Sequence, residues 1–132
     1  MENILNLVDQ GKYTEAIEMI NRSSEEIQDK GRIIMAKADS KYELGLDLEA
    51  LEDYVSYLIK YPSGHGKNFA LIGIVVCLKN LELYAVAKQF IEMIDDVHEG
   101  KEKEMNDANR LIEKQNIARE IIGTLLLRSA DE

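Results

Sequence analysis

The chain contains few of the residues on which several classes of protein depend. Its 132 residues include one Cys, one Pro and no Trp. A single Cys cannot form an internal disulfide, so the sequence gives no sign of an oxidising compartment. Lys and Arg number 16 against 25 Asp and Glu, and the net charge is -9. This balance argues against nucleic acid or an anionic membrane surface as the partner, since both attract basic proteins.

Long hydrophobic runs are also scarce. The longest covers residues 69–78 and is far shorter than the roughly 20 apolar residues that a membrane-spanning helix needs. Residues 1–4 lack the basic start and apolar stretch of a secretory signal peptide. We therefore expect a cytoplasmic protein that makes no use of a membrane. The length fits a single domain with one core.

The apolar residues that are present recur mostly at helical spacing. Ser23 and Glu26 have the spacing of a capping box, which predicts a helix start. The apolar run at 69–78 also suits a strand, but no other segment looks able to pair with it, so we expect a buried helix there. The pattern predicts helices over residues 4–8, 16–20, 23–45, 48–58, 69–78, 84–94 and 101–128.

An internal repeat runs through the first two thirds of the chain. Residues 11–17 align without a gap with residues 45–51, which places Gly over Gly and Ala over Ala at a period of 34. A third copy, residues 80–86, follows at a spacing of 35 residues. It has Asn80 in place of the glycine, and Asn tolerates the left-handed conformation that glycine supplies in such turns.

These residues resemble the tetratricopeptide repeat family, whose unit is two antiparallel helices joined at a glycine. Gly45, Ala50, Tyr54 and Pro62 stand at the family's positions in the second unit, and Ala85 in the third. The resemblance implies an all-α fold, a right-handed solenoid of about three antiparallel helix pairs. It divides the single domain into a truncated first unit (1–30), a second (31–64), a third (65–100) and a C-terminal capping helix (101–128).

The resemblance also implies a concave groove lined by the first helix of each unit. The family's clamp for C-terminal carboxylates is absent, because Met35 and Asp39, then Ala70 and Ile74, replace its basic and amide residues. A mostly apolar groove between Arg32 and Lys67 favours an amphipathic helix or an apolar peptide. Carried over by register, the lining is Leu5, Val8, Arg32, Met35, Asp39, Tyr42, Lys67, Ala70, Ile74 and Cys77.

The C-terminal segment has more apolar surface than a cap requires. Residues 121–127 are apolar on more than one face of a helix, whereas a cap needs only one such face. Two interpretations remain open at this point. The helix either caps the array, in which case it can also fill the groove, or it mediates self-association. The residues for self-association are Ile121, Ile122, Leu125 and Leu126.

Three features with possible chemistry have simpler explanations. Cys77 lies in an apolar helix with no nearby His or second Cys, as buried cysteines do. Residues 95–99 hold a His among carboxylates without a second His at ligand spacing, which is typical of a solvated helix end. Residues 64–67 lack most of a phosphate-binding loop and are expected to link two repeats. We therefore expect neither a metal, a cofactor nor an active site.

The sequence favours a non-catalytic protein-interaction module, an adaptor, scaffold or chaperone-like protein that holds a protein or peptide segment in its groove. An Ile74→Glu variant would test that groove. Two alternatives remain. One is a homo-oligomeric structural protein that assembles through its C-terminal helix, and the other is a regulator that responds to a short signalling peptide.

Overall fold

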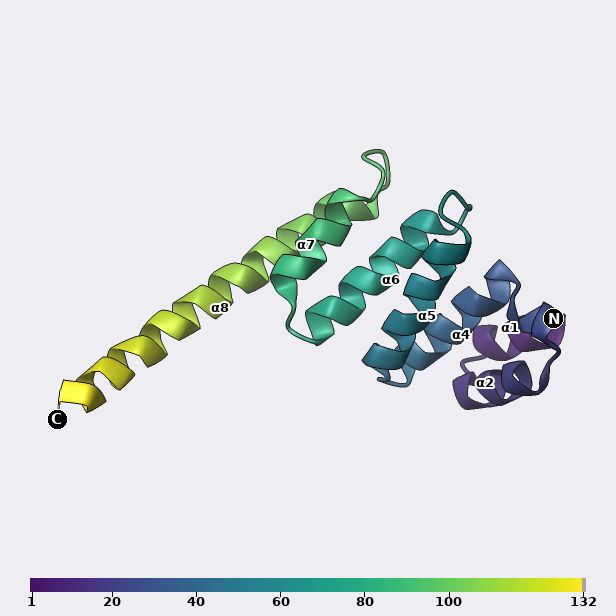
Figure 1. Ribbon diagram of the computed structural model, residues 1–132, viewed down its shortest axis with the longest axis horizontal. Helices are drawn as coiled ribbons and strands as arrows, with labels where there is room; N and C mark the ends of the chain where they lie inside the picture. The colour runs from purple at the N-terminus through teal and green to yellow at the C-terminus, as the bar shows by residue number, and fades with distance from the viewer. Residues whose placement is uncertain (132) are drawn as a thin grey trace.

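All regular structure in residues 1–131, the part of the chain that the computed structural model describes, is α-helical (Figure 1). Side chains are described as far as Arg128. The buried-helix prediction for residues 69–78 is confirmed. The helices are α1 (Glu2–Asp9), α2 (Tyr13–Arg22), α3 (Glu25–Gln28), α4 (Gly31–Glu43), α5 (Asp47–Lys60), α6 (Lys67–Asn80), α7 (Tyr84–Glu92) and α8 (Gly100–Asp131).

Helices that are neighbours in the sequence pack against each other along most of the chain. In addition α1, α4, α6 and α8 each contact the next of these four, while α2, α5 and α7 make no contacts with one another within residues 1–131. Figure 1 shows the resulting row, with α1 and α2 at one end and α8 at the other. The contacts thus divide the longer helices into two sets. We call α1, α4, α6 and α8 the continuous set, and α2, α5 and α7 the separated set.

The same turn joins α1 to α2, α4 to α5, and α6 to α7. In each turn one residue is left-handed: Gly11 (φ 74°), Gly45 (φ 78°) and Glu82 (φ 62°). Each of these amides donates to a carbonyl three residues back, and the next amide donates to a carbonyl five residues back. These paired bonds are those of the Schellman motif, which satisfies carbonyls at the helix end.

The third turn corrects the repeat register inferred from the sequence. The left-handed residue is Glu82, two positions after Asn80, which is the last residue of α6. The alanine equivalent to Ala16 and Ala50 is therefore Ala87, which is fully buried like both of them, whereas Ala85 is exposed. The sequence register for this unit is wrong by two residues.

Glu82 offers a direct test of this turn. A left-handed conformation costs an L-residue roughly 1 to 2 kcal/mol, and glycine adopts it freely. We expect Glu82→Gly to raise the free energy of unfolding by about 1 kcal/mol, measured by urea denaturation. Glu52→Gly, at an exposed position beyond the first turn of α5, is the matched control and should lower it by about 1 kcal/mol. Equal losses in both variants would contradict the assigned turn.

The predicted helix over residues 23–45 is interrupted, and that prediction is wrong. Ser24, rather than Ser23, caps the short α3 by accepting a hydrogen bond from the Ile27 amide at 3.4 Å. The Ser23 hydroxyl instead donates to the Met19 carbonyl at 2.8 Å. A residue far along the chain stabilises the break before α4, because the Tyr61 hydroxyl donates to the Asp29 carbonyl at 2.8 Å. Such a long-range contact leaves no signal in local periodicity.

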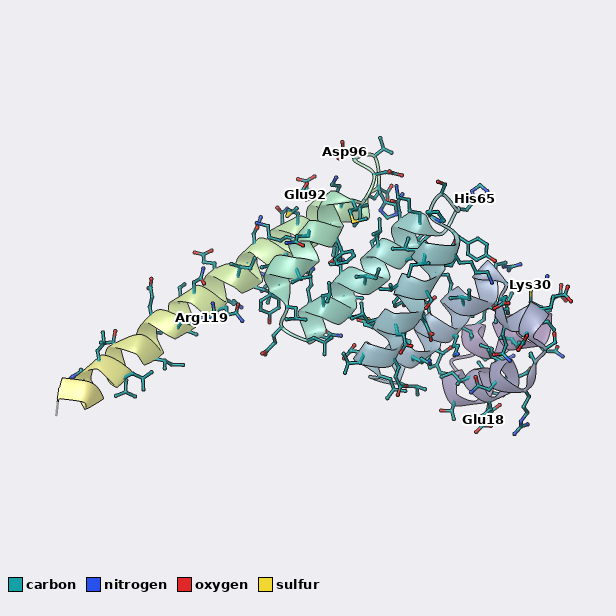
Figure 2. All side chains as sticks on the ribbon, viewed as in Figure 1. Glu18, Lys30, His65, Glu92, Asp96 and Arg119 are labelled. Atoms are coloured by element: carbon teal, nitrogen blue, oxygen red, sulfur yellow. The ribbon has the colours of Figure 1, made fainter. Side chains whose placement is uncertain are left out.

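The helix predicted over residues 101–128 is confirmed, but only its first part packs against the array. Ala108 is fully buried, and Met105 packs on the main core cluster. The Lys79 ammonium of α6 bonds to the carboxylates of Glu104 and Asp107 and so ties α8 to α6. Beyond this contact α8 extends past the rest of the molecule (Figures 1 and 2), with Arg119 on the projecting part.

Candidate functional site

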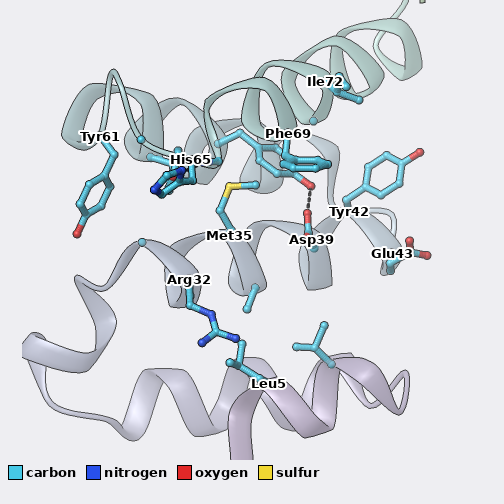
Figure 3. Close-up of a pocket in the computed structure, with 18 of the residues that line it drawn as sticks. Leu5, Arg32, Met35, Asp39, Tyr42, Glu43, Tyr61, His65, Phe69 and Ile72 are labelled. Carbon is cyan, nitrogen blue, oxygen red and sulfur yellow. Dashed lines mark hydrogen bonds between the residues drawn. The ribbon is translucent and has the colours of Figure 1, made fainter. Parts of the chain in front are cut away.

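A hollow of about 990 Å³ lies on the continuous set of helices. Figure 3 shows α4 along it, with Leu5 of α1 on one side and Phe69 and Ile72 of α6 on the other. The lining combines apolar side chains with carboxylates and tyrosines. It comprises Leu5, Val8, Asp9, Tyr13, Gly31, Arg32, Met35, Ala36, Asp39, Tyr42, Glu43, Tyr54, Tyr57, Tyr61, Gly64, His65, Gly66, Phe69, Ile72, Gly73 and Val76.

The structure brings together some of the residues predicted to line a groove and separates others. Leu5, Val8, Arg32, Met35, Asp39 and Tyr42 lie on the cavity wall. For α6 the predicted lining is wrong. Ala70, Ile74 and Cys77 are fully buried in the main core cluster, and Lys67 lies outside the cavity.

The two-residue register error explains this displacement. Counting from the turn residues, Glu82 is equivalent to Gly45, so α6 aligns with α4 at a spacing of 37 residues rather than 35. At that spacing Phe69, Ile72 and Val76 take the places of Arg32, Met35 and Asp39. All three of these α6 residues line the cavity.

Two tyrosines of α5 and Tyr61, the residue that follows it, form a part of the site that the sequence interpretation did not include. Tyr54, Tyr57 and Tyr61 all reach the cavity, and the rings of Tyr57 and Tyr61 lie 5.3 Å apart. Their spacing of three and four residues puts them on one helix face, a signal that was available in the sequence. The Tyr57 hydroxyl accepts a hydrogen bond from the Gly66 amide at 3.0 Å, which links α5 to the start of α6.

Tyr54 lies between α4 and α6. Its hydroxyl donates to Asp39 Oδ1 at 2.5 Å, the bond drawn in Figure 3. On the other side its ring lies against Gly73, where an added Cβ would fall 2.5 Å from Tyr54 Cζ. Gly73 therefore accommodates a side chain of the preceding helix α5.

The cavity carries more carboxylates than cations. Asp9, Asp39 and Glu43 contribute negative charge against the single guanidinium of Arg32. Surrounding protein desolvates the Asp39 carboxyl and raises its pKa, while the bond from Tyr54 lowers it in part. Burial and the neighbouring carboxylate raise the pKa of Tyr54, so its hydroxyl remains a donor. The arrangement suits an apolar ligand with cationic groups at its edge.

The other features singled out in the sequence lie apart from the cavity or have no free chemistry. Burial raises the pKa of the Cys77 thiol to about 12, so it is not a thiolate at neutral pH. In residues 64–67, the segment compared with a phosphate-binding loop, the Gly66 amide already donates to the Tyr57 hydroxyl. The Asn68 side-chain amide donates to Asp95 Oδ2 at 3.0 Å, and this bond together with the Lys67 ammonium lowers the pKa of Asp95. Within the described residues no three His, Cys, Asp or Glu side chains are placed to hold a metal ion.

The C-terminal helix does not fill the cavity of its own chain. Within residues 1–131, α8 contacts α6 and α7 only and contributes nothing to the lining. The predicted self-association residues Ile121, Ile122, Leu125 and Leu126 are between 56% and 67% exposed. Both apolar surfaces are therefore uncovered in a single chain.

Comparisons with known proteins give no family. No protein-family model matches the chain, and no curated protein or solved structure matches it. Among the helices of the described part, none is long and apolar enough to cross a membrane.

Proposed function

We propose that this chain is a tetratricopeptide-like helical solenoid that binds an amphipathic helix or an apolar peptide in its concave groove. The order of helix contacts supports a curved array. The continuous set α1, α4, α6 and α8 lies close together, whereas α2, α5 and α7 stand apart from one another. In a row of helix pairs that curves toward one side, the inner helices lie close together and the outer helices are spread apart. Repeat arrays of this kind bind partners on the inner side.

The observation that carries the proposal is the cavity itself. It lies on the inner helices α1, α4 and α6, and it exposes Met35, Phe69, Ile72 and Val76 together. Its volume of about 990 Å³ is at the upper end of the range for ligand sites. Phe69 is 64% exposed at its rim, an unfavourable position for a phenyl ring unless a partner covers it.

The polar groups at this site are suited to recognition rather than to reaction. Asp39 has its hydrogen bond from Tyr54, and Cys77 lies in the core with its proton retained. Asp9, Asp39 and Glu43 would contact cationic or amide groups at the edge of an apolar ligand face. The function is accordingly non-catalytic, that of a cytoplasmic adaptor, scaffold or chaperone-like protein.

A selection of displayed peptides against the wild-type chain tests this function. We expect the selected peptides to have apolar residues at helical spacing, which form one face of a helix, and basic residues beside that face. Their dissociation constants, measured by fluorescence anisotropy, should rise about tenfold or more in Phe69→Glu, because a carboxylate then replaces the ring at the rim. Phe69 is largely exposed, so the variant is expected to fold.

Ile59→Glu is the matched control. Ile59 is 78% exposed on α5 and does not line the cavity, and its substitution adds the same charge. Peptides that bind Phe69→Glu as tightly as the wild type would show that binding lies elsewhere. Failure to select any helical peptide would count against the groove function as a whole.

A further inference from the structure

The projecting part of α8 carries an apolar face that has no partner within the described chain. Ile117, Ile121 and Leu125 form one row at a spacing of four residues, and Ala118, Ile122 and Leu126 form the adjacent row. At about 100° per residue these two rows cover roughly half of the helix circumference. That is wider than the seam of a two-stranded coiled coil, so the face fits a concave surface that surrounds a helix on both sides.

The charges on this face and directly at its edge are positive. At the same rotation per residue, Lys114 and Arg128 lie within the face and Arg119 lies about 20° beyond the Leu126 row, whereas Glu113 and Glu120 lie about 40° and 60° beyond the Ile117 row. Two copies of α8 placed face to face would bring these cations together. Pairing of α8 with α8 is therefore electrostatically unfavourable.

The cavity has the complementary properties. Its lining combines apolar side chains with Asp9, Asp39 and Glu43, whose three carboxylates outnumber the single guanidinium of Arg32. The net charge of the wall is therefore opposite in sign to that of the α8 face. The α4 helix beside it has 13 residues, about 20 Å, and the α8 face from 117 to 126 spans about 15 Å. α8 cannot reach its own cavity, because its first part is fixed to α6 and α7 and the rest extends away (Figure 1).

From this complementarity in charge, length and curvature we infer that the groove of one chain binds the projecting α8 of a second copy. The inference rests on the proposed groove function and names its occupant. The groove and the helix are different surfaces, and a two-fold axis between two copies repeats the contact between them twice. Two copies that exchange their α8 helices fill both grooves and close a dimer.

Sedimentation velocity with full-length chains tests the exchange. We expect the wild type at about 100 µM to have a mass above the 15.0 kDa of one chain. Phe69→Glu in the groove and Leu125→Glu on α8 should each weaken self-association about tenfold or more. An equimolar mixture of the two variants should associate again, because the intact α8 of the first fits the intact groove of the second.

Leu127→Glu is the control for the helix, since Leu127 is exposed on the opposite side of α8, and it should associate like the wild type. Association that survives Phe69→Glu but not Leu125→Glu would mean pairing of α8 with α8 and would overturn the inference. So would a wild type that remains one chain at about 100 µM, which would assign the α8 face to a different protein. In that case the groove function is judged separately, by the selected peptides.

Discussion

Ile74→Glu is expected to destabilise the fold strongly rather than to weaken binding alone. Ile74 is fully buried in the main core cluster, and a carboxylate there would lose its hydration without a placed partner. A buried, unpaired polar or charged group is among the most destabilising changes known in proteins, and we expect a loss of about 4 kcal/mol or more. Thermal unfolding followed by circular dichroism measures it.

The pH dependence provides a second signature of this variant. Desolvation would raise the pKa of the new carboxyl in the folded state, so folding would favour its protonated form. A group with a raised folded-state pKa stabilises the fold at low pH and loses that contribution as the pH rises through the folded pKa. Ile74→Glu should therefore melt at a higher temperature at pH 5 than at pH 7.

Phe69→Glu is the matched control on the same helix. Phe69 is 64% exposed, so the same carboxylate would remain hydrated and the melting temperature should change little. The pair also tests the register of α6. If Ile74→Glu melted like the wild type while Phe69→Glu did not fold, the 35-residue register inferred from the sequence would be correct and the assignment of the cavity wall wrong.

The sequence predicted the helices well because their ends carry strong local signals. Gly11 and Gly45 mark left-handed residues that few other side chains tolerate, and residues 61–64 interrupt the apolar pattern after α5. The helical nature of residues 69–78 followed from the lack of a pairing strand. In each case the deciding information was local, or was an absence visible in the whole sequence.

The register of the third repeat could not be predicted from local sequence signals. Ala85 and Ala87 are two residues apart, and either can be aligned with Ala50. The deciding residue was Glu82, which is left-handed in the turn between α6 and α7 although no glycine marks the position. One error of two residues then moved the predicted α6 lining from Phe69, Ile72 and Val76 into the core.

The extent of α8 docking could not be predicted for a related reason. The apolar pattern continues through residues 105–125, but α6 and α7 end where they can contact only the first part of α8. How far a helix is covered depends on the lengths of its neighbours, and periodicity does not report this. The sequence did indicate the surplus apolar surface at 121–127, and the structure shows that surface exposed.

Gly73→Ala is expected to destabilise the chain by about 2 to 3 kcal/mol, although alanine is the better helix former. The new Cβ would lie 2.5 to 2.7 Å from three atoms of the Tyr54 ring. This ring cannot move aside easily, because it is buried and its hydroxyl is bonded to Asp39. The gain of about 1 kcal/mol in helix propensity is therefore outweighed by overpacking between α5 and α6. Urea denaturation measures the change in the free energy of unfolding.

Gly123→Ala separates the two contributions. Gly123 is also helical, and an added Cβ there meets nothing within 4 Å, so only propensity acts and stability should rise by up to about 1 kcal/mol. Combining Gly73→Ala with Tyr54→Leu removes the ring that the new methyl group meets. The double variant should lose less than the sum of the two single losses, because the variants share this contact. Additive losses would mean that Tyr54 does not pack on Gly73, and with that the α5 wall of the cavity would be misplaced.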